Sequence, residues 1–275
     1  MLTNYHTHSM LCDGKMMPED YVKSAIRKGF KALGFSGHAP VHFDLDCAMS
    51  KDHFHEYIES ILMLKEKYKD TIQIYLGLET DYYPGCKDYR GMPEIDYTIG
   101  GIHFVSDPAS ERVFFFDGSE KEFCDNRDVV FKGNIRLLVE SYYNILIEMI
   151  VNQPPDILAH LDVLKKNNKG SRFFDESETW YRSIVEKTLV KVKERNIIVE
   201  INTGGISRGY TKDMYPSFWI ISLMHEMGIP VILNSDAHHP DWIDTYFTEA
   251  IKILSSAGYK SRHILLDGKW QEVPL

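Results

Sequence analysis

The first strand, the first helix and the second strand can be identified in residues 2–38, LTNYHTHSMLCDGKMMPEDYVKSAIRKGFKALGFSGH. The runs at residues 2–6 and 32–36 are short and apolar, which predicts two strands. A helix is predicted to begin at Pro18, because proline suits the first helical turn and the two acids after it suit the positive end of the helix dipole. This helix is expected to end near Gly29. A strand, a helix and a second strand in this order indicate a parallel βαβ unit.

The same alternation continues along the chain and predicts about seven parallel strands. Further strands are expected at residues 72–78, 97–102, 157–160, 197–201 and 231–234, and further helices at residues 51–69, 135–151, 177–195, 217–227 and 241–257. A short strand-like segment is expected after the last helix. Residues 104–132 are predicted to be irregular, and irregular stretches of this length are usually functional lids or disordered. Because no linker is visible and α/β barrels of about 250 residues commonly form one unit, we expect one domain over residues 1–275.

Composition limits the possible partners and the compartment. The chain has 31 Lys plus Arg and 40 Asp plus Glu, so its formal charge is 31 − 40 = −9. This balance opposes general attraction to nucleic acid or to an anionic membrane, and we expect neither partner. No apolar stretch is long enough to span a membrane, and residues 1–15 lack an export signal. The four cysteines are widely spaced, which predicts free thiols and a cytoplasmic location: Cys12, Cys47, Cys86 and Cys124.

Nearly every predicted strand is followed by a side chain that can bind a metal ion. These side chains are His6, His8, His38, Glu79, His103, His160, Asp236 and His238. In a closed parallel barrel the carboxyl ends of the strands meet at one mouth, so residues far apart in sequence become neighbours there. The sequence therefore predicts a single site built from several strand ends.

Two His-x-His pairs occur, and they are expected to behave differently. His6 and His8 leave a strand, where positions two apart share a face and can bind one ion together. His53 and His55 lie in a predicted helix, where positions two apart point in different directions, so we expect them on the solvated surface. Residues 236–238 repeat the spacing of the first pair and support the metal interpretation.

The mixture of imidazole and carboxylate ligands suits zinc, manganese or iron. These ligands are too many for one four-coordinate ion, so two or three divalent ions are expected, with a carboxylate such as Glu79 bridging them. Three such ions opposite Asp13, Glu79 and Asp236 would leave a local charge of roughly +3. The site is therefore expected to attract phosphate in spite of the acidic background.

These residues resemble those of the polymerase and histidinol phosphatase (PHP) family of metal-dependent phosphoesterases, over nearly the whole chain. The resemblance is carried by residues 5–9, 12–14 with 18–19, 34–40, 77–79, 99–105, 159–162 and 234–238. Within the family, four segments are most similar to histidinol-phosphate phosphatases: residues 38–40, 100–105, 200–205 and 215–217.

The resemblance implies a distorted (β/α)7 barrel, similar to a TIM barrel, with a three-metal centre. One ion would be held by His6, His8, Glu79 and Asp236, a second by Glu79, His103 and His160, and a third by Asp13, His38 and His238. Two positions depart from the family pattern. Gly37 stands where many relatives carry Asp before the histidine, and Asp13 stands near a position where some relatives use His.

The implied reaction is hydrolysis of a phosphate monoester, L-histidinol phosphate to L-histidinol plus phosphate in histidine biosynthesis. A metal-activated hydroxide would attack phosphorus, and the residues expected to act in catalysis are Glu79, Asp236, His238 and Arg208. Arg208 is also the best candidate for a bidentate phosphate contact, and weaker substrate-binding candidates are His42, Lys165 and His239. Acids that could face the cationic groups of this substrate are Asp44, Asp46, Asp107, Glu111 and Asp117.

Three other functions remain open at this stage. An amidohydrolase barrel also begins with His-x-His, but it typically places a metal-bridging lysine where this chain has Glu79. A nuclease or nucleotide phosphoesterase of the same family would need clustered basic residues, which the charge balance disfavours. The third alternative is a metal-binding module without catalytic activity.

Overall fold

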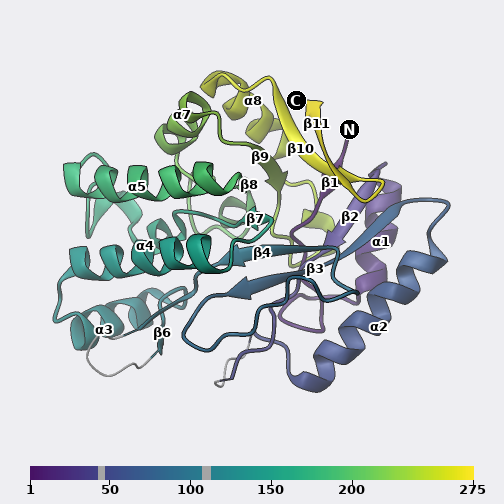
Figure 1. Ribbon diagram of the computed structural model, residues 1–275, viewed down its shortest axis with the longest axis horizontal. Coiled ribbons are helices and arrows are strands. Elements are labelled where there is room, and N and C mark those ends of the chain that lie inside the picture. Colours follow the sequence, from purple (N-terminus) through teal and green to yellow (C-terminus); the bar gives the residue numbers. More distant parts are fainter. Residues whose placement is uncertain (43–46, 107–112) are drawn as a thin grey trace.

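The computed structural model describes residues 1–42, 47–106 and 113–275 (Figure 1). Seven strands form one parallel sheet in the order β1-β2-β3-β4-β7-β8-β9. They are β1 (Thr3–Asn4), β2 (Ala32–Phe35), β3 (Gln73–Asp81), β4 (Tyr97–Gly101), β7 (Ile157–Leu158), β8 (Ile198–Asn202) and β9 (Val231–Asn234). The two edge strands meet just beyond their ends, where the His8 amide donates to the Ala237 carbonyl and the Ala237 amide donates to that of His6. The predicted distorted seven-stranded barrel is therefore confirmed.

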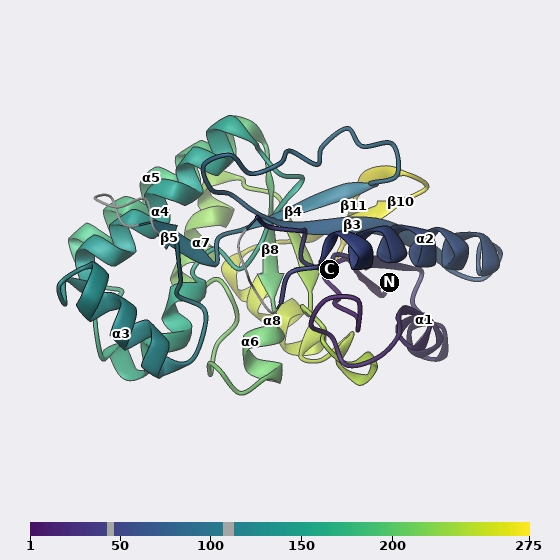
Figure 2. The same ribbon diagram turned by 90° about the horizontal axis from the view of Figure 1, so that it is seen from below.

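Helices cover the outside of the barrel, with α4 and α5 on one side of the sheet and α1 and α2 on the other (Figures 1 and 2). The outer helices are α1 (Pro18–Arg27), α2 (Lys51–Lys67), α4 (Ile135–Asn152), α5 (Thr179–Arg195), α7 (Phe218–Met227) and α8 (Phe247–Ala257). The last helix begins later than predicted. Residues Pro240–Trp242 form a separate 3-10 turn, and Tyr246 has a left-handed backbone (φ +62°), which an α-helix does not accommodate.

The expectation of an irregular stretch at 104–132 is wrong. Strands β5 (Phe104–Ser106) and β6 (Val113–Phe115) form an antiparallel hairpin, and helix α3 (Glu120–Val130) follows. The helix begins with a capping box in which Ser119 and Glu122 bond each other's backbone amides. Phe123 is fully buried and fixes this helix against the rest of the protein.

A short helix, α6 (Gly204–Ser207), follows β8 directly.

The interior of the barrel is filled below the carboxyl ends of its strands. Tyr97 lies inside, close to Gly34 and Gly77, where an added Cβ would come within 2.3 Å of the tyrosine side chain. A C-terminal hairpin, β10 (Ser261–Leu266) with β11 (Lys269–Pro274), lies beside the N-terminus. The Tyr5 hydroxyl donates to the Leu265 carbonyl at 2.7 Å and ties this hairpin to the barrel. The predicted metal ligands lie at the other end of the barrel, where the strands have their carboxyl ends.

The structure also bears on the predicted free thiols and on the predicted lack of a membrane-spanning segment. The four cysteines, all within the part of the chain that the structure describes, are free and half-buried. Among the described helices, we find none with both the length and the apolar character needed to cross a bilayer.

Candidate metal centre

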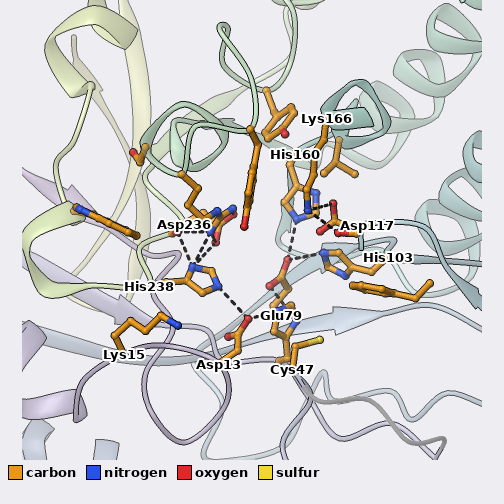
Figure 3. Close-up of a pocket in the computed structure, with 18 residues that line it drawn as sticks. Asp13, Lys15, Cys47, Glu79, His103, Asp117, His160, Lys166, Asp236 and His238 are labelled. Atoms are coloured by element: carbon orange, nitrogen blue, oxygen red, sulfur yellow. Dashed lines mark hydrogen bonds and ion pairs between the residues drawn. The ribbon is translucent and has the colours of Figure 1, made fainter. Parts of the chain in front are cut away.

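One carboxylate, Glu79, lies at the centre of the predicted ligands (Figure 3). It is almost completely buried and sits near the end of β3, where its amide donates to the Gly37 carbonyl. Each of its oxygens faces a different group of imidazoles. Oε2 lies 3.2 Å from His6 Nε2, 3.3 Å from His8 Nε2 and 3.3 Å from His38 Nδ1, and Oε1 lies 3.0 Å from His160 Nε2 and 3.6 Å from His103 Nε2.

These separations fit ligands that share ions. Two ligands of a tetrahedral ion, each about 2.0–2.2 Å from it, lie about 3.4 Å apart. The Nε2 atoms of His6 and His8 have no hydrogen-bond partner among the described residues, although both are fully buried. Buried imidazole nitrogens directed at a carboxylate suit divalent cations, so the residues present fit the ions implied by the sequence.

Asp236 completes the first predicted group of ligands. Its Oδ1 lies 3.4 Å from His8 Nε2 and 3.7 Å from His6 Nε2. Asp236 has a left-handed backbone (φ +48°), a conformation that costs energy for a non-glycine residue and is common at functional sites. The structure therefore brings His6, His8, Glu79 and Asp236 together, and likewise Glu79, His103 and His160.

The third predicted group is arranged differently from the other two. Asp13 Oδ2 lies 3.1 Å from His238 Nε2 and 3.7 Å from His38 Nε2, but its Oδ1 also lies 3.2 Å from His8 Nδ1. Compact groups form from His8 with Asp13 and His38, and from His8 with Asp236 and His238. His8 thus stands between the members of the predicted trio, and a third ion held by Asp13, His38 and His238 stays a prediction.

The charges of the site shift the pKa values of Glu79 and of the histidines in different directions. Burial alone would raise the pKa of Glu79, but the surrounding histidines, led by His6 and His38, hold it well below its usual value. Burial would lower the pKa of His103, but Asp81 and Glu79 raise it to about 10. Burial lowers the pKa of His38 to about 4 in spite of its acidic neighbours. The central carboxylate is therefore ionised at neutral pH and available to bind cations.

Some charged residues beside the site were not predicted from the sequence. Asp81 Oδ2 lies 3.0 Å from His103 Nδ1, on the side of the ring opposite Glu79. Its place two residues after Glu79 on the same strand face could have indicated it. Lys15 and Lys166 also line the cavity, and Lys166 forms an ion pair with Asp117 at 2.9 Å.

Arg208 lies in the cavity and contacts Asp236. Its Nη2 lies 2.7 Å from Asp236 Oδ2 and its Nη1 lies 3.1 Å from Oδ1, so the guanidinium holds the carboxylate with two bonds. Nη1 also lies 2.7 Å from His238 Nδ1. Burial would raise the pKa of Asp236, but Arg208 and the neighbouring histidines hold it well below its usual value.

The weaker substrate-binding candidates lie outside the cavity. Lys165 is buried and bonds Asp162 and Ser217, whereas its neighbour Lys166 lines the cavity. His239 caps the 3-10 turn at Pro240 by accepting the Asp241 amide. His42 is exposed and packs its ring on Tyr83. Neither histidine is among the described residues that line the cavity.

His53 and His55 are exposed on α2, which confirms their predicted surface position.

The cavity above the ligands has a volume of about 650 Å³. Besides the metal ligands it is lined by Phe115, Asp117, Lys166, Tyr210, Tyr215 and Trp242. Of the predicted acidic wall, only Asp117 can be placed, and it faces this cavity. The other four acids, Asp44, Asp46, Asp107 and Glu111, lie outside the described residues.

The chain is similar in sequence and in fold to proteins of known families. Residues 4–204 match the PHP domain. The chain is 27% identical to the "Probable histidinol-phosphatase" of Deinococcus radiodurans, with 94% of each chain covered. It is 26% identical to the histidinol-phosphatase of Bacillus subtilis, covering 85% of this chain and 92% of the relative. A similar crystal structure is that of histidinol phosphate phosphatase from Lactococcus lactis, complexed with zinc, L-histidinol and phosphate (TM-score 0.71, 19% identity, 98% of each chain).

Proposed function

Because this chain belongs to the PHP domain family, we propose that it is a metal-dependent phosphatase that hydrolyses L-histidinol phosphate to L-histidinol and phosphate. The observation that carries this proposal is the position of Glu79, whose two oxygens face two separate groups of histidines. The names of the relatives, which match over most of their length, support the substrate. The zinc, L-histidinol and phosphate bound in the Lactococcus lactis enzyme support both the metal and the substrate.

The residues that would hold two or three divalent ions, zinc, manganese or iron, are those that surround Glu79. When bound, such ions provide hydroxide near neutral pH and neutralise charge on the phosphoryl oxygens. The protein contributes the geometry. Glu79 separates the two groups of imidazoles, and Arg208 holds Asp236 in place beside His6 and His8. With its ligands fixed in this way, the site needs little rearrangement during the reaction.

The remaining wall of the cavity suits a small substrate with a cationic end. A volume of about 650 Å³ falls in the range of small-molecule sites. Asp117 lines the same cavity and offers a carboxylate to the amine or imidazole of histidinol phosphate. Lys166 pairs with this acid, and Arg208, which contacts Asp236, adds positive charge for the phosphate. The cavity thus offers opposite charges for the two ends of this substrate.

The C-terminal hairpin supports one domain over residues 1–275, since it packs on β9 and accepts the Tyr5 hydroxyl. The four free thiols support a cytoplasmic location.

A substrate panel tests the proposed function. The metal-loaded enzyme is assayed for phosphate release from L-histidinol phosphate, nucleoside monophosphates and a short oligonucleotide, and for ring opening of a dihydroorotate-like amide, with and without added manganese or zinc. We expect kcat/KM for L-histidinol phosphate to exceed that for every other substrate by at least about 100-fold, since a cavity matched to both charged ends discriminates strongly. A preference for nucleotides, for the oligonucleotide or for the amide would contradict the proposal, and so would metal binding without any turnover.

The variant Asp117→Asn tests recognition of the cationic end. We expect KM for L-histidinol phosphate to rise about tenfold, the usual effect of losing one charged contact, with little change for p-nitrophenyl phosphate, which has no amine. Asn keeps an oxygen for Lys166, so the wall itself should persist. Asp125→Asn on α3 is the matched control, because it removes an acid that pairs with Lys121 outside the cavity. Equal changes in KM for both substrates would contradict this role of Asp117.

A further inference from the structure

A second buried carboxylate, Glu200 in β8, lies behind the metal ligands. Its side chain is fully buried and accepts four hydrogen bonds. Oε1 accepts from His6 Nδ1 at 2.7 Å and from Asn234 Nδ2 at 3.0 Å, and Oε2 accepts from Asn202 Nδ2 at 2.8 Å and from the His160 amide at 3.2 Å. An isolated buried carboxylate is costly, so four donors around one carboxylate indicate a site built to hold it ionised.

The orientations of the Asn234 and Asn202 side-chain amides are fixed by the backbone. The side-chain oxygen of Asn234 accepts the Tyr5 amide at 2.8 Å, and that of Asn202 accepts the Gly204 amide at 2.8 Å. Each asparagine therefore has to direct its NH2 group at Glu200. Among the described residues, neither lysine nor arginine forms an ion pair with Glu200, and His6 is its one titratable ion-pair partner. The negative charge of Glu200 is therefore paired with the imidazole of His6.

We infer that Glu200 is a positioning residue that holds His6 as a metal ligand. A hydrogen bond from Nδ1 to Glu200 keeps the proton on that nitrogen, so the lone pair stays on Nε2. His6 Nε2 is the atom that lies 3.2 Å from Glu79. Through the amide of His160, Glu200 also fixes the backbone that carries a ligand of the other group. Glu200 therefore contacts both groups, through the ring of His6 and, by a longer bond, through the backbone of His160.

Asp81 offers an internal comparison. It contacts His103 Nδ1 at 3.0 Å, whereas Glu200 contacts His6, so the two acids orient ligands on opposite oxygens of Glu79. Replacing each acid by its amide should therefore weaken a different ion. The inference rests on the proposed function for its metal chemistry, but its test needs no substrate.

The test measures zinc and manganese binding to Glu200→Gln by competition with a chromophoric chelator. Glutamine has one acceptor and one NH2 group, and that NH2 group must face either His6 or the donors on the Asn202 side. We expect the ion bound by His6 to dissociate 10- to 100-fold more readily, with the ion bound by His103 and His160 retained. In Asp81→Asn we expect the opposite pattern. Asp162→Asn is the matched control, because it removes a fully buried acid that pairs with Lys165 and should lower thermal stability alone.

Wild-type affinity at every ion of Glu200→Gln, with only a lowered melting temperature, would overturn the inference. A second measurement uses the wild type and does not depend on folding of a variant. In the zinc-loaded protein labelled with 15N-histidine, the His6 resonances, identified by their absence from His6→Gln, should show a protonated Nδ1 protected from exchange and a metal-bound Nε2. An unprotonated or metal-bound Nδ1 would overturn the inference, whether or not L-histidinol phosphate is hydrolysed.

Discussion

Glu79→Gln is expected to lower kcat for L-histidinol phosphate by at least about 1,000-fold while the barrel stays folded. The carboxylate presents one oxygen to His6, His8 and His38 and the other to His103 and His160. Glutamine keeps an oxygen on one side only and turns an NH2 group toward the other, so it cannot bridge two ions. Steady-state kinetics, metal analysis and the melting temperature of the metal-free protein check the three parts of this prediction.

The control for this variant is Glu140→Gln. It makes the same chemical change on the outer helix α4, where Glu140 pairs with Arg136 at 2.8 Å. We expect wild-type kinetics and a full complement of metal in the control. If Glu79→Gln retained both the wild-type rate and the wild-type metal content, Glu79 would not be a bridging ligand. A variant that lost metal because it had unfolded would be recognised by its melting curve.

The ligands around Glu79 could be predicted because of a general property of parallel barrels. The residues just beyond each strand lie at the same mouth, so His103, two residues after β4, and His160, two residues after β7, meet although 57 positions separate them in the sequence. Glu200 gave no such signal. It lies inside β8 rather than beyond it, and its role is visible only in the structure, in the hydrogen bonds from His6, two asparagines and the His160 amide.

Local geometry explains the other differences between sequence and structure. Lys165 and Lys166 are adjacent in a 3-10 helix (Val163–Asn167), where successive side chains point about 120° apart. Only one of them can face the cavity, and the sequence does not specify which one. The hairpin and helix α3 were missed because residues 104–132 lack a long apolar period, although the capping box at Ser119 is visible in the sequence.

Arg208→Ala is expected to lower kcat/KM by about 100- to 1,000-fold, the range found when one charge-stabilising donor is removed from an active site. The guanidinium binds both oxygens of Asp236 and also lies next to His238. Alanine would remove the two bonds that hold this buried carboxylate and would remove a cation from the cavity. Arg208→Lys restores the charge without the two-pronged geometry, so we expect only partial recovery. Steady-state kinetics at saturating metal measure both variants.

Two measurements separate the two possible roles of Arg208. If it binds the phosphoryl group, the inhibition constant of inorganic phosphate should rise at least about tenfold in Arg208→Ala even with every ion bound. If it only orients Asp236, phosphate inhibition should be unchanged and the ion held by His6, His8 and Asp236 should bind more weakly. Arg136→Ala removes an exposed arginine that pairs with Glu140 and controls for the loss of charge. Unchanged phosphate inhibition at full metal occupancy would therefore contradict the phosphate contact, because no role other than orienting Asp236 would then remain for the guanidinium.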